Sequence, residues 1–275
     1  MAEQADVKTG SAVRVSSGKY PGRGKALNEE IIYGRNSLQE LLQSGKPINK
    51  VLFQTETQNR RNQDLIALLK DRGIPFQFVD RVTLDRLSKQ GVHQGVLAYI
   101  AAQEYSSLGD ILSTARAKGE DPLILVLDEI SDPHNLGAML RTVNAAGAHG
   151  VVIPKRRSVA LTGTVAKVSA GAVAYVKVAR VSNLVQALKQ LRKEGCWISG
   201  ADAGGTDAFK TDLKGPRVLV VGAEGQGLSR LVRETCDEII SLPMYGEITS
   251  LNAAVAGSVL LYEIIRQRKE VEKGR

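Results

Sequence analysis

The chain has 275 residues, of which 43% are hydrophobic and 24% charged, with a formal net charge of +8; this composition is that of a globular protein and excludes disorder of the whole chain. The uncharged run at residues 248–262 has 15 residues, fewer than the roughly 18 to 20 of a membrane-spanning helix. The two cysteines provide neither a disulfide framework nor a zinc pattern, and the first segment resembles no leader, so we expect a cytoplasmic protein without a metal or a membrane span.

The N-terminal part is predicted to be a tail followed by a small α/β domain. Residues 1–27 hold four glycines and five cations without an apolar period, which is typical of a disordered basic tail, either a loose RNA-binding arm or a terminus without a role. Residues 28–103 alternate short apolar runs with helical patterns and are predicted to form a compact α/β domain. Its strands are expected at 50–54, 75–79 and 96–101, and its helices at 37–42 with Ser37 as the N-cap, at 62–72 and at 83–89.

Residues 104–121 are predicted to be a linker with one polar helix, and residues 122–275 a second domain. Apolar strand runs alternate here with helical patterns, which indicates a parallel sheet covered on both faces. The strands are expected at 123–127, 150–153, 196–199, 217–221 and 238–242, and the helices at 136–146, 183–193 and 251–268.

The second domain contains a long stretch of sequence with basic but no acidic residues. Residues 133–193 contain no Asp or Glu but ten Lys and Arg. Such a stretch favours a polyanion as partner, because its field attracts phosphate groups. The alternative is a solvated basic face without a partner.

The first candidate site follows the strand at 123–127. Asn135 stands where an N-cap is expected, and Gly137 allows another segment to approach the first helical turn. Arg141 follows six residues later, about 9 Å along the helix axis. A helix start with an Asn and an Arg can hold a phosphate or a ribose; a capped helix with a surface Arg is the alternative.

The second candidate site follows the strand at 217–221. The run Gly222-Ala223-Glu224-Gly225-Gln226-Gly227 places three glycines in six residues, which indicates a loop whose backbone N–H groups can face a ligand. Its order, G-x-x-G-x-G, differs from the dinucleotide fingerprint G-x-G-x-x-G. A nicotinamide oxidoreductase is therefore disfavoured.

The third candidate site runs from Leu242 to Ala256. It passes from a strand through a glycine-containing loop into the final helix, with Ser250 as the expected N-cap. Small and branched residues of that helix, at 251, 254, 255, 258 and 259, form a predicted packing face. The alternative is an ordinary loop before a core helix.

The three sites together resemble a known family. N-x-G-x-x-x-R-T at 135–142, G-A-E-G-x-G-L-S at 222–229 and L-P-M-x-G-x-x-x-S-L-N-A-A-V-A at 242–256 resemble the motifs of the SpoU, or TrmH-like, RNA ribose 2′-O-methyltransferases. The resemblance implies an α/β fold: a trefoil-knotted, Rossmann-like methyltransferase domain of the SPOUT type, preceded by a small α/β RNA-binding domain. Residues 32–36 and 91–96 resemble that first domain, and the two-domain layout is most similar to the subgroup that methylates a guanosine in 23S ribosomal RNA.

The resemblance implies S-adenosylmethionine as cofactor, ribosomal RNA as partner, a homodimer and no metal. The residues implied to bind the cofactor are Gly222, Leu242 and Leu251, through their main chain, together with Gly227 and Met244. The residues implied for catalysis are Arg141, Asn135, Ser250, Asn252 and Glu224. Arg141 would clamp the RNA phosphate and stabilise the alkoxide, or act as the base itself. Asn135, Ser250 and Asn252 would orient the ribose or order the loop. Glu224 would brace the cofactor loop.

Three other functions remain open at this point. The same reaction on a transfer RNA and an antibiotic-resistance methyltransferase of ribosomal RNA would share all three motifs. A non-catalytic RNA-binding protein of this fold would have a damaged cofactor loop, whereas the glycine run and the Ser250-Leu251-Asn252 segment are intact.

Overall fold

The structure is a computed structural model that describes residues 31–55, 62–89 and 91–273. It divides into two compact units, with the boundary between Glu104 and Tyr105. The predicted basic tail, residues 1–27, lies outside the described residues. No helix in the described part of the chain is long and apolar enough to cross a membrane.

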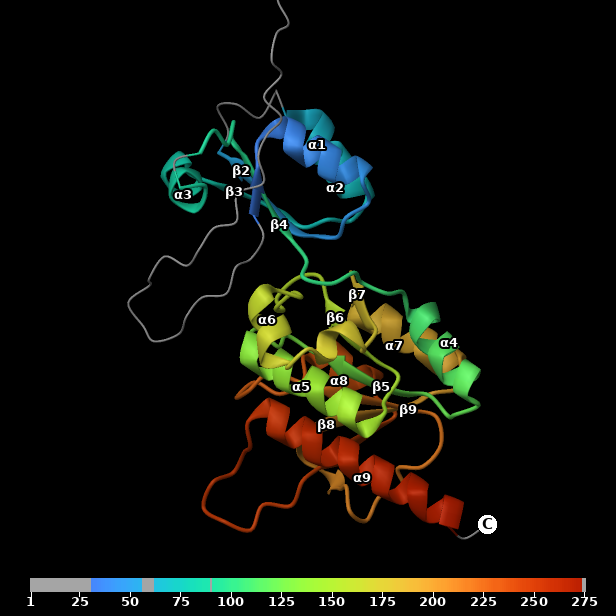
Figure 1. Ribbon diagram of the computed structural model, residues 1–275. Helices are drawn as coiled ribbons and strands as arrows, with labels where there is room; N and C mark the ends of the chain where they lie inside the picture. The colour runs from blue at the N-terminus through green and yellow to red at the C-terminus, as the bar shows by residue number, and fades with distance from the viewer. Residues whose placement is uncertain (1–30, 56–61, 90, 274–275) are drawn as a thin grey trace, which may run out of the picture. The chain divides into compact units, whose positions relative to one another are not determined.

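The first unit is a mixed four-stranded sheet with strand order β1-β4-β2-β3 (Figure 1). Strand β4 is antiparallel to β1 and β2, whereas β2 and β3 are parallel. Leucines of α1 and α2 form one core with this sheet, and Leu84 of α3 packs with a smaller cluster that includes Leu52 and Leu97. The elements are β1 (Ile31–Tyr33), α1 (Arg35–Gln43), β2 (Ile48–Gln54), α2 (Gln63–Asp71), β3 (Phe76–Val79), α3 (Arg81–Leu87) and β4 (Val96–Ile100).

Helix α1 begins earlier than predicted, and Ser37 is not its N-cap. The N-cap is Gly34, whose φ of 100° lies in the region that favours glycine. Its carbonyl accepts a hydrogen bond from the Leu38 N–H at 3.1 Å. The helix starts at Gly34 because the chain must turn there out of strand β1, and Ser37 therefore lies within the first turn.

The second unit contains a six-stranded sheet with strand order β10-β8-β9-β5-β6-β7, in which every pair is parallel. The predicted parallel sheet is thus present. Its strands are β5 (Leu123–Leu127), β6 (Gly150–Pro154), β7 (Val178–Val181), β8 (Trp197–Asp207), β9 (Arg217–Val221) and β10 (Glu238–Ser241).

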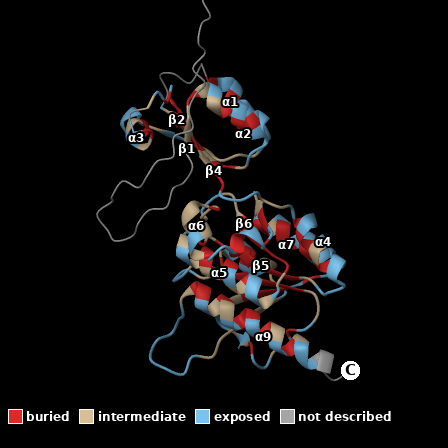
Figure 2. Ribbon diagram, in the orientation of Figure 1, coloured by how far each residue is buried: buried red, intermediate tan, exposed pale blue. Residues whose placement is uncertain are grey.

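Helices cover both faces of this sheet, so that its central strands β9, β5 and β6 are almost wholly buried (Figure 2). Alternate residues of β5 point to opposite layers: Leu125 packs with α5, α6 and α9, and Ile124 packs with α4, α7 and α8. The helices are α4 (Leu108–Lys118), α5 (Pro133–Ala146), α6 (Gly163–Val168), α7 (Leu184–Lys193), α8 (Arg230–Thr235) and α9 (Ala253–Lys273).

The structure differs from the predicted linker at residues 104–121. These residues contain α4, which is capped by Ser107 and ended by Gly119. Ile111 and Leu112 of α4 are buried in the same core as α7. The polar surface of α4 suggested a linker, but its narrow apolar stripe belongs to the second unit.

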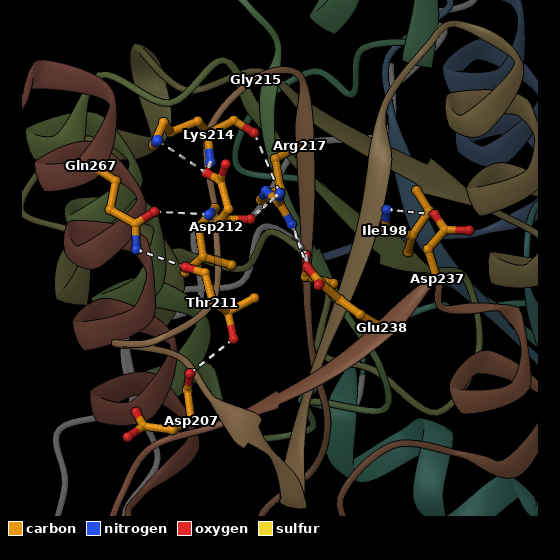
Figure 3. Close-up of polar contacts among 12 residues, drawn as sticks. Ile198, Asp207, Thr211, Asp212, Lys214, Gly215, Arg217, Asp237, Glu238 and Gln267 are labelled. Carbon is orange, nitrogen blue, oxygen red and sulfur yellow. Dashed lines mark hydrogen bonds and ion pairs between the residues drawn. The ribbon is translucent and has the colours of Figure 1, made fainter. Parts of the chain in front are cut away.

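A buried ion-pair network holds the amino ends of β9 and β10 together (Figure 3). Arg217, which is 5% exposed, pairs with Glu238 and donates to Ser199 Oγ at 2.5 Å and to the Asp212 carbonyl at 2.8 Å. Gln267 of α9 accepts from the Leu213 N–H at 2.8 Å. These contacts stabilise the end of the sheet at which β9 begins, and they leave the carboxyl ends of the strands for the site below.

Candidate active site

A cavity of about 270 Å³ lies at the carboxyl ends of β9 and β10 and beside residues 201–203 of β8, at the edge of the sheet where ligands of open α/β sheets bind. Its wall is formed by the two loops that carry the second and third motifs and by the first turns of α9. All five predicted cofactor-binding residues line it, as do two of the predicted catalytic residues. These are Gly222, Gly227, Leu242, Met244 and Leu251, and Glu224 and Ser250.

The glycine loop is folded so tightly that Gly222 has no room for a side chain. A Cβ at Gly222 would lie 2.1 Å from the Gly227 carbonyl oxygen, far inside van der Waals contact. The loop is closed by a hydrogen bond of 2.9 Å from the Gly227 N–H to the Ala223 carbonyl. Gly225 and Gly227 have φ values of 78° and 67°. Glycine is therefore required here by backbone conformation and by close approach, and main chain forms much of the cavity wall.

Asn252 joins the three motifs. Its Nδ2 donates to Asn135 Oδ1 at 3.0 Å and to Glu224 Oε2 at 3.1 Å. Its Oδ1 accepts from the Ala254 and Val255 N–H groups at 3.0 and 3.3 Å. The structure thus brings together three of the five predicted catalytic side chains, of which Asn135 and Asn252 are 117 positions apart in the sequence.

Two predicted helix caps are wrong. Helix α5 begins at Pro133, and Asp132 is its N-cap, with Oδ1 accepting from the His134 N–H at 2.8 Å. Proline is favoured at the first helical position because its fixed φ suits the helix, so Asn135 lies inside the first turn. At α9 the side chain of Asn252, not that of Ser250, accepts from the first free N–H groups.

Arg141 lies exposed on α5 and does not line the cavity. No described carboxylate lies within 4.0 Å of its guanidinium, so its fork is available to a ligand. The next residue, Thr142, shares a hydrogen bond of 2.8 Å with Ser258 of α9. This bond ties the helix that carries Arg141 to the helix that follows the cavity loop.

Asp128 is a residue of the site that the sequence reasoning did not single out. It follows β5 directly, is 3% exposed, and accepts a hydrogen bond from the Ser229 N–H at 2.7 Å. It therefore connects the carboxyl end of β5 with the end of the glycine loop. A charged residue immediately after a fully apolar strand is the signal that points to it.

The acid-free stretch is less uniform than its sequence suggests. Arg157 pairs with Glu129 at 3.2 Å, and Arg192 pairs with Asp237 at 2.7 Å. The Arg180 guanidinium lies 5.3 Å from the centre of the Tyr105 ring, and burial lowers its pKa. Two of these cations thus pair with acids from outside the stretch, and a third packs on an aromatic ring.

The fold and the site together define an α/β enzyme with a nucleotide-sized cavity, closed by a glycine loop, beside an amide and carboxylate cluster. Among the described residues no group of three or more His, Cys, Asp or Glu could hold a metal ion.

Comparison with known proteins identifies the family. Residues 122–262 match the SpoU rRNA Methylase family, and residues 31–106 match the RNA 2′-O ribose methyltransferase substrate-binding domain. YacO of Bacillus subtilis, named as a TrmH family tRNA/rRNA methyltransferase, is 46% identical over 243 residues, which are 88% of this chain and 97% of YacO. The chain therefore belongs to the SpoU/TrmH family of RNA 2′-O-ribose methyltransferases.

Solved structures agree with this assignment. The SpoU methyltransferase AviRb from Streptomyces viridochromogenes, crystallised with AdoMet, is 25% identical, with a TM-score of 0.55 over 87% of this chain and 90% of its own. The A. aeolicus TrmH/SpoU tRNA modifying enzyme is 31% identical, with a TM-score of 0.50 over 56% of this chain and 78% of its own. The predicted family, two-domain α/β fold and enzyme class are confirmed, and S-adenosylmethionine is the methyl donor of this family.

Proposed function

We propose that this protein methylates the ribose 2′-hydroxyl of a guanosine in 23S ribosomal RNA. The observation that carries the reaction is the Asn252 side chain, which bonds both Asn135 and Glu224 beside the glycine-loop cavity. The match of residues 31–106 to a substrate-binding domain of RNA ribose methyltransferases supports RNA as the substrate, and the name of the SpoU rRNA Methylase family supports ribosomal RNA.

The cavity fits S-adenosylmethionine in its chemistry. Leu242, Met244 and Leu251 offer apolar walls to a flat base, and the glycine loop offers backbone groups to polar atoms. Bound there, the cofactor supplies an electrophilic methyl group on a sulfonium. The side chains of this chain must then hold the ribose and manage the proton of its hydroxyl.

Arg141 is the residue to which we assign the charge that develops on the ribose oxygen. A ribose hydroxyl is a very weak acid, so its oxygen needs a partner that stabilises negative charge as the proton leaves. A guanidinium stays protonated at any working pH, which suits a clamp for phosphate and alkoxide; a role as the base itself is the alternative. Asn135, Ser250 and Asn252 would orient the ribose, and Glu224 holds Asn252 in place.

The test is transfer of a radiolabelled methyl group from S-adenosylmethionine to separate ribosomal and transfer RNAs, followed by mapping of the modified ribose. Label on a guanosine of 23S ribosomal RNA is the expected result. The transfer RNA alternative has its own support, since YacO is named for both RNAs, and label on transfer RNA alone would establish it. Label on neither RNA would contradict the proposal and favour RNA binding without catalysis.

We also propose a homodimer formed through the exposed apolar residues of α9. The small residues Ala254 and Gly257 are buried inside this unit, because a Cβ at Gly257 would lie 3.2 Å from Val221. Of the predicted packing face, Val255 and Val259 remain exposed, and with Tyr262 they form an apolar stripe at 48%, 39% and 50% exposure. These positions share one helix face.

Val259→Asp is expected to convert the protein from dimer to monomer in analytical ultracentrifugation, because a charge would enter an apolar interface. Lys189→Asp on α7, which also exposes a new carboxylate, should leave the dimer intact and serves as the control. A wild-type monomer at micromolar concentration would refute the proposed dimer. The trefoil knot and the cytoplasmic location stay predictions.

A further inference from the structure

Strand β8 departs from its neighbour β10 beside the cavity. Consecutive residues Ile239 and Ile240 of β10 pair with Gly200 and Thr206 of β8, so residues 201–205 bulge out of that ladder. A bulge re-aims the side chains that it carries. Here it brings residues 201–203 to the cavity wall.

Two glycines allow this bulge. Gly204 has a φ of 74°, which side chains rarely adopt. A Cβ at Gly205 would lie 2.7 Å from the Ile239 backbone, so β10 can approach only a glycine there. Ala201, the residue before Asp202, pairs with Val221, the last residue of β9. Asp202 therefore lies beside the start of the glycine loop.

The carboxylate of Asp202 is held in place from two sides. Its Oδ1 accepts from the Ala203 N–H at 2.8 Å, and its Oδ2 pairs with Arg233 of α8. The same Oδ1 would lie 2.9 Å from a Cβ at Gly227, so the carboxylate packs against the glycine loop itself. Each carboxylate oxygen has a second lone pair, so acceptor capacity remains.

Asp202 and Glu224 are the two charged residues among the described residues that line the cavity, and they have different neighbours. Glu224 bonds Asn252 and thereby Asn135 of α5, where the RNA ribose would react. Asp202 stands on β8, which is separated from β5 by β9. It therefore belongs to the part of the cavity away from the reacting methyl group.

We propose that Asp202 binds the ribose of the cofactor's adenosine by accepting hydrogen bonds from its 2′- and 3′-hydroxyls. A vicinal diol presents two donors, and an ionised carboxylate is an acceptor-only group that can accept both. The hydrogen bond from the Ala203 N–H and the ion pair to Arg233 orient the carboxylate before the ligand arrives. This inference rests on the proposed function, because it assigns one end of the proposed cofactor.

Calorimetric titration of the full-length protein with S-adenosylhomocysteine and with 5′-methylthioadenosine, which lacks the amino-acid part, tests this assignment. Asp202→Asn keeps the shape but loses the charge, and it is expected to bind both ligands about tenfold or more weakly, the usual scale for hydrogen bonds to a charged group. Glu234→Gln, which removes an acid of α8 that pairs with Arg230, should bind both ligands as the wild type does.

Two further measurements separate a ligand contact from a structural role. Arg233→Met removes the same ion pair but leaves the carboxylate, so its affinity should fall much less than that of Asp202→Asn. The 2′,3′-dideoxy form of 5′-methylthioadenosine should bind wild type and Asp202→Asn equally. Equal losses of affinity in Arg233→Met and Asp202→Asn would overturn the assignment. Unchanged binding of 5′-methylthioadenosine by Asp202→Asn would also overturn it. If that variant at the same time bound S-adenosylhomocysteine more weakly, the carboxylate would lie at the ligand's ammonium group.

The failure of the inference can be told apart from failure of the proposed function. If wild type binds S-adenosylhomocysteine and only the Asp202 variant behaves unexpectedly, the inference fails and the methyltransferase proposal stands. If wild type binds neither ligand, the proposed function itself is contradicted.

Discussion

Replacing Arg141 by alanine or by lysine is expected to lower methyl transfer to RNA at least about a hundredfold, the scale of a group that acts on the transition state. Arg141 is exposed on α5, and no described carboxylate competes for it within 4.0 Å. A phosphate can therefore engage its planar fork by two parallel hydrogen bonds, which the single ammonium of lysine cannot reproduce. The lysine variant tests geometry, and the alanine variant tests charge and geometry together.

Single-turnover methylation of RNA, with S-adenosylhomocysteine affinity and sedimentation measured alongside, checks this prediction. Both variants should bind the ligand and sediment as the wild type does, because Arg141 lines neither the cavity nor the apolar stripe of α9. Near-normal turnover of Arg141→Lys would show that this residue contributes charge alone. Lost ligand binding in both variants would show that Arg141 supports the cavity instead.

Gly222→Val is expected to abolish cofactor binding. The structure gives a different physical reason for this loss than the sequence does. From the sequence, the added side chain would be expected to meet the adenosine and leave the fold largely intact. In the structure the Cβ itself would lie 2.1 Å from the Gly227 carbonyl oxygen and 2.6 Å from the Leu228 N. The loop must therefore open, which we expect to cost about 2 to 3 kcal/mol of unfolding free energy, the scale of overpacking.

The matched comparison is Gly222→Ala against Gly246→Ala. A Cβ at Gly246 would meet no atom within 4 Å, and its φ is not in the left-handed range. Gly246→Ala should therefore keep the thermal midpoint and the ligand affinity of the wild type. Gly222→Ala should have a lower thermal midpoint and bind the ligand more weakly. Unchanged stability of Gly222→Ala in denaturant titration would show that the loop is more compliant than its geometry indicates.

The amino-acid sequence determined the elements whose pattern is strong over several residues. The runs LILVL and RVLVV became β5 and β9 because every residue except Arg217 is apolar and all ten positions are buried. The helix predicted at 183–193 is α7, which begins one residue later because Asn183 is its N-cap and its side chain accepts from the Gln186 N–H at 3.1 Å. The short helices α6 and α8, of six residues each, carry too little periodicity to predict. The motifs were sufficient to predict the family because each motif is a contiguous run of residues.

The tertiary structure alone decided how those motifs meet. The Asn135–Asn252 hydrogen bond joins residues 117 positions apart, and no local pattern encodes such a distance. The same holds for the close approach of Gly222 to Gly227 and for the bulge that places Asp202 at the cavity. Sequence periodicity reports which face of an element is buried, whereas contacts across a site depend on the strand order β10-β8-β9-β5, which only the packed sheet establishes.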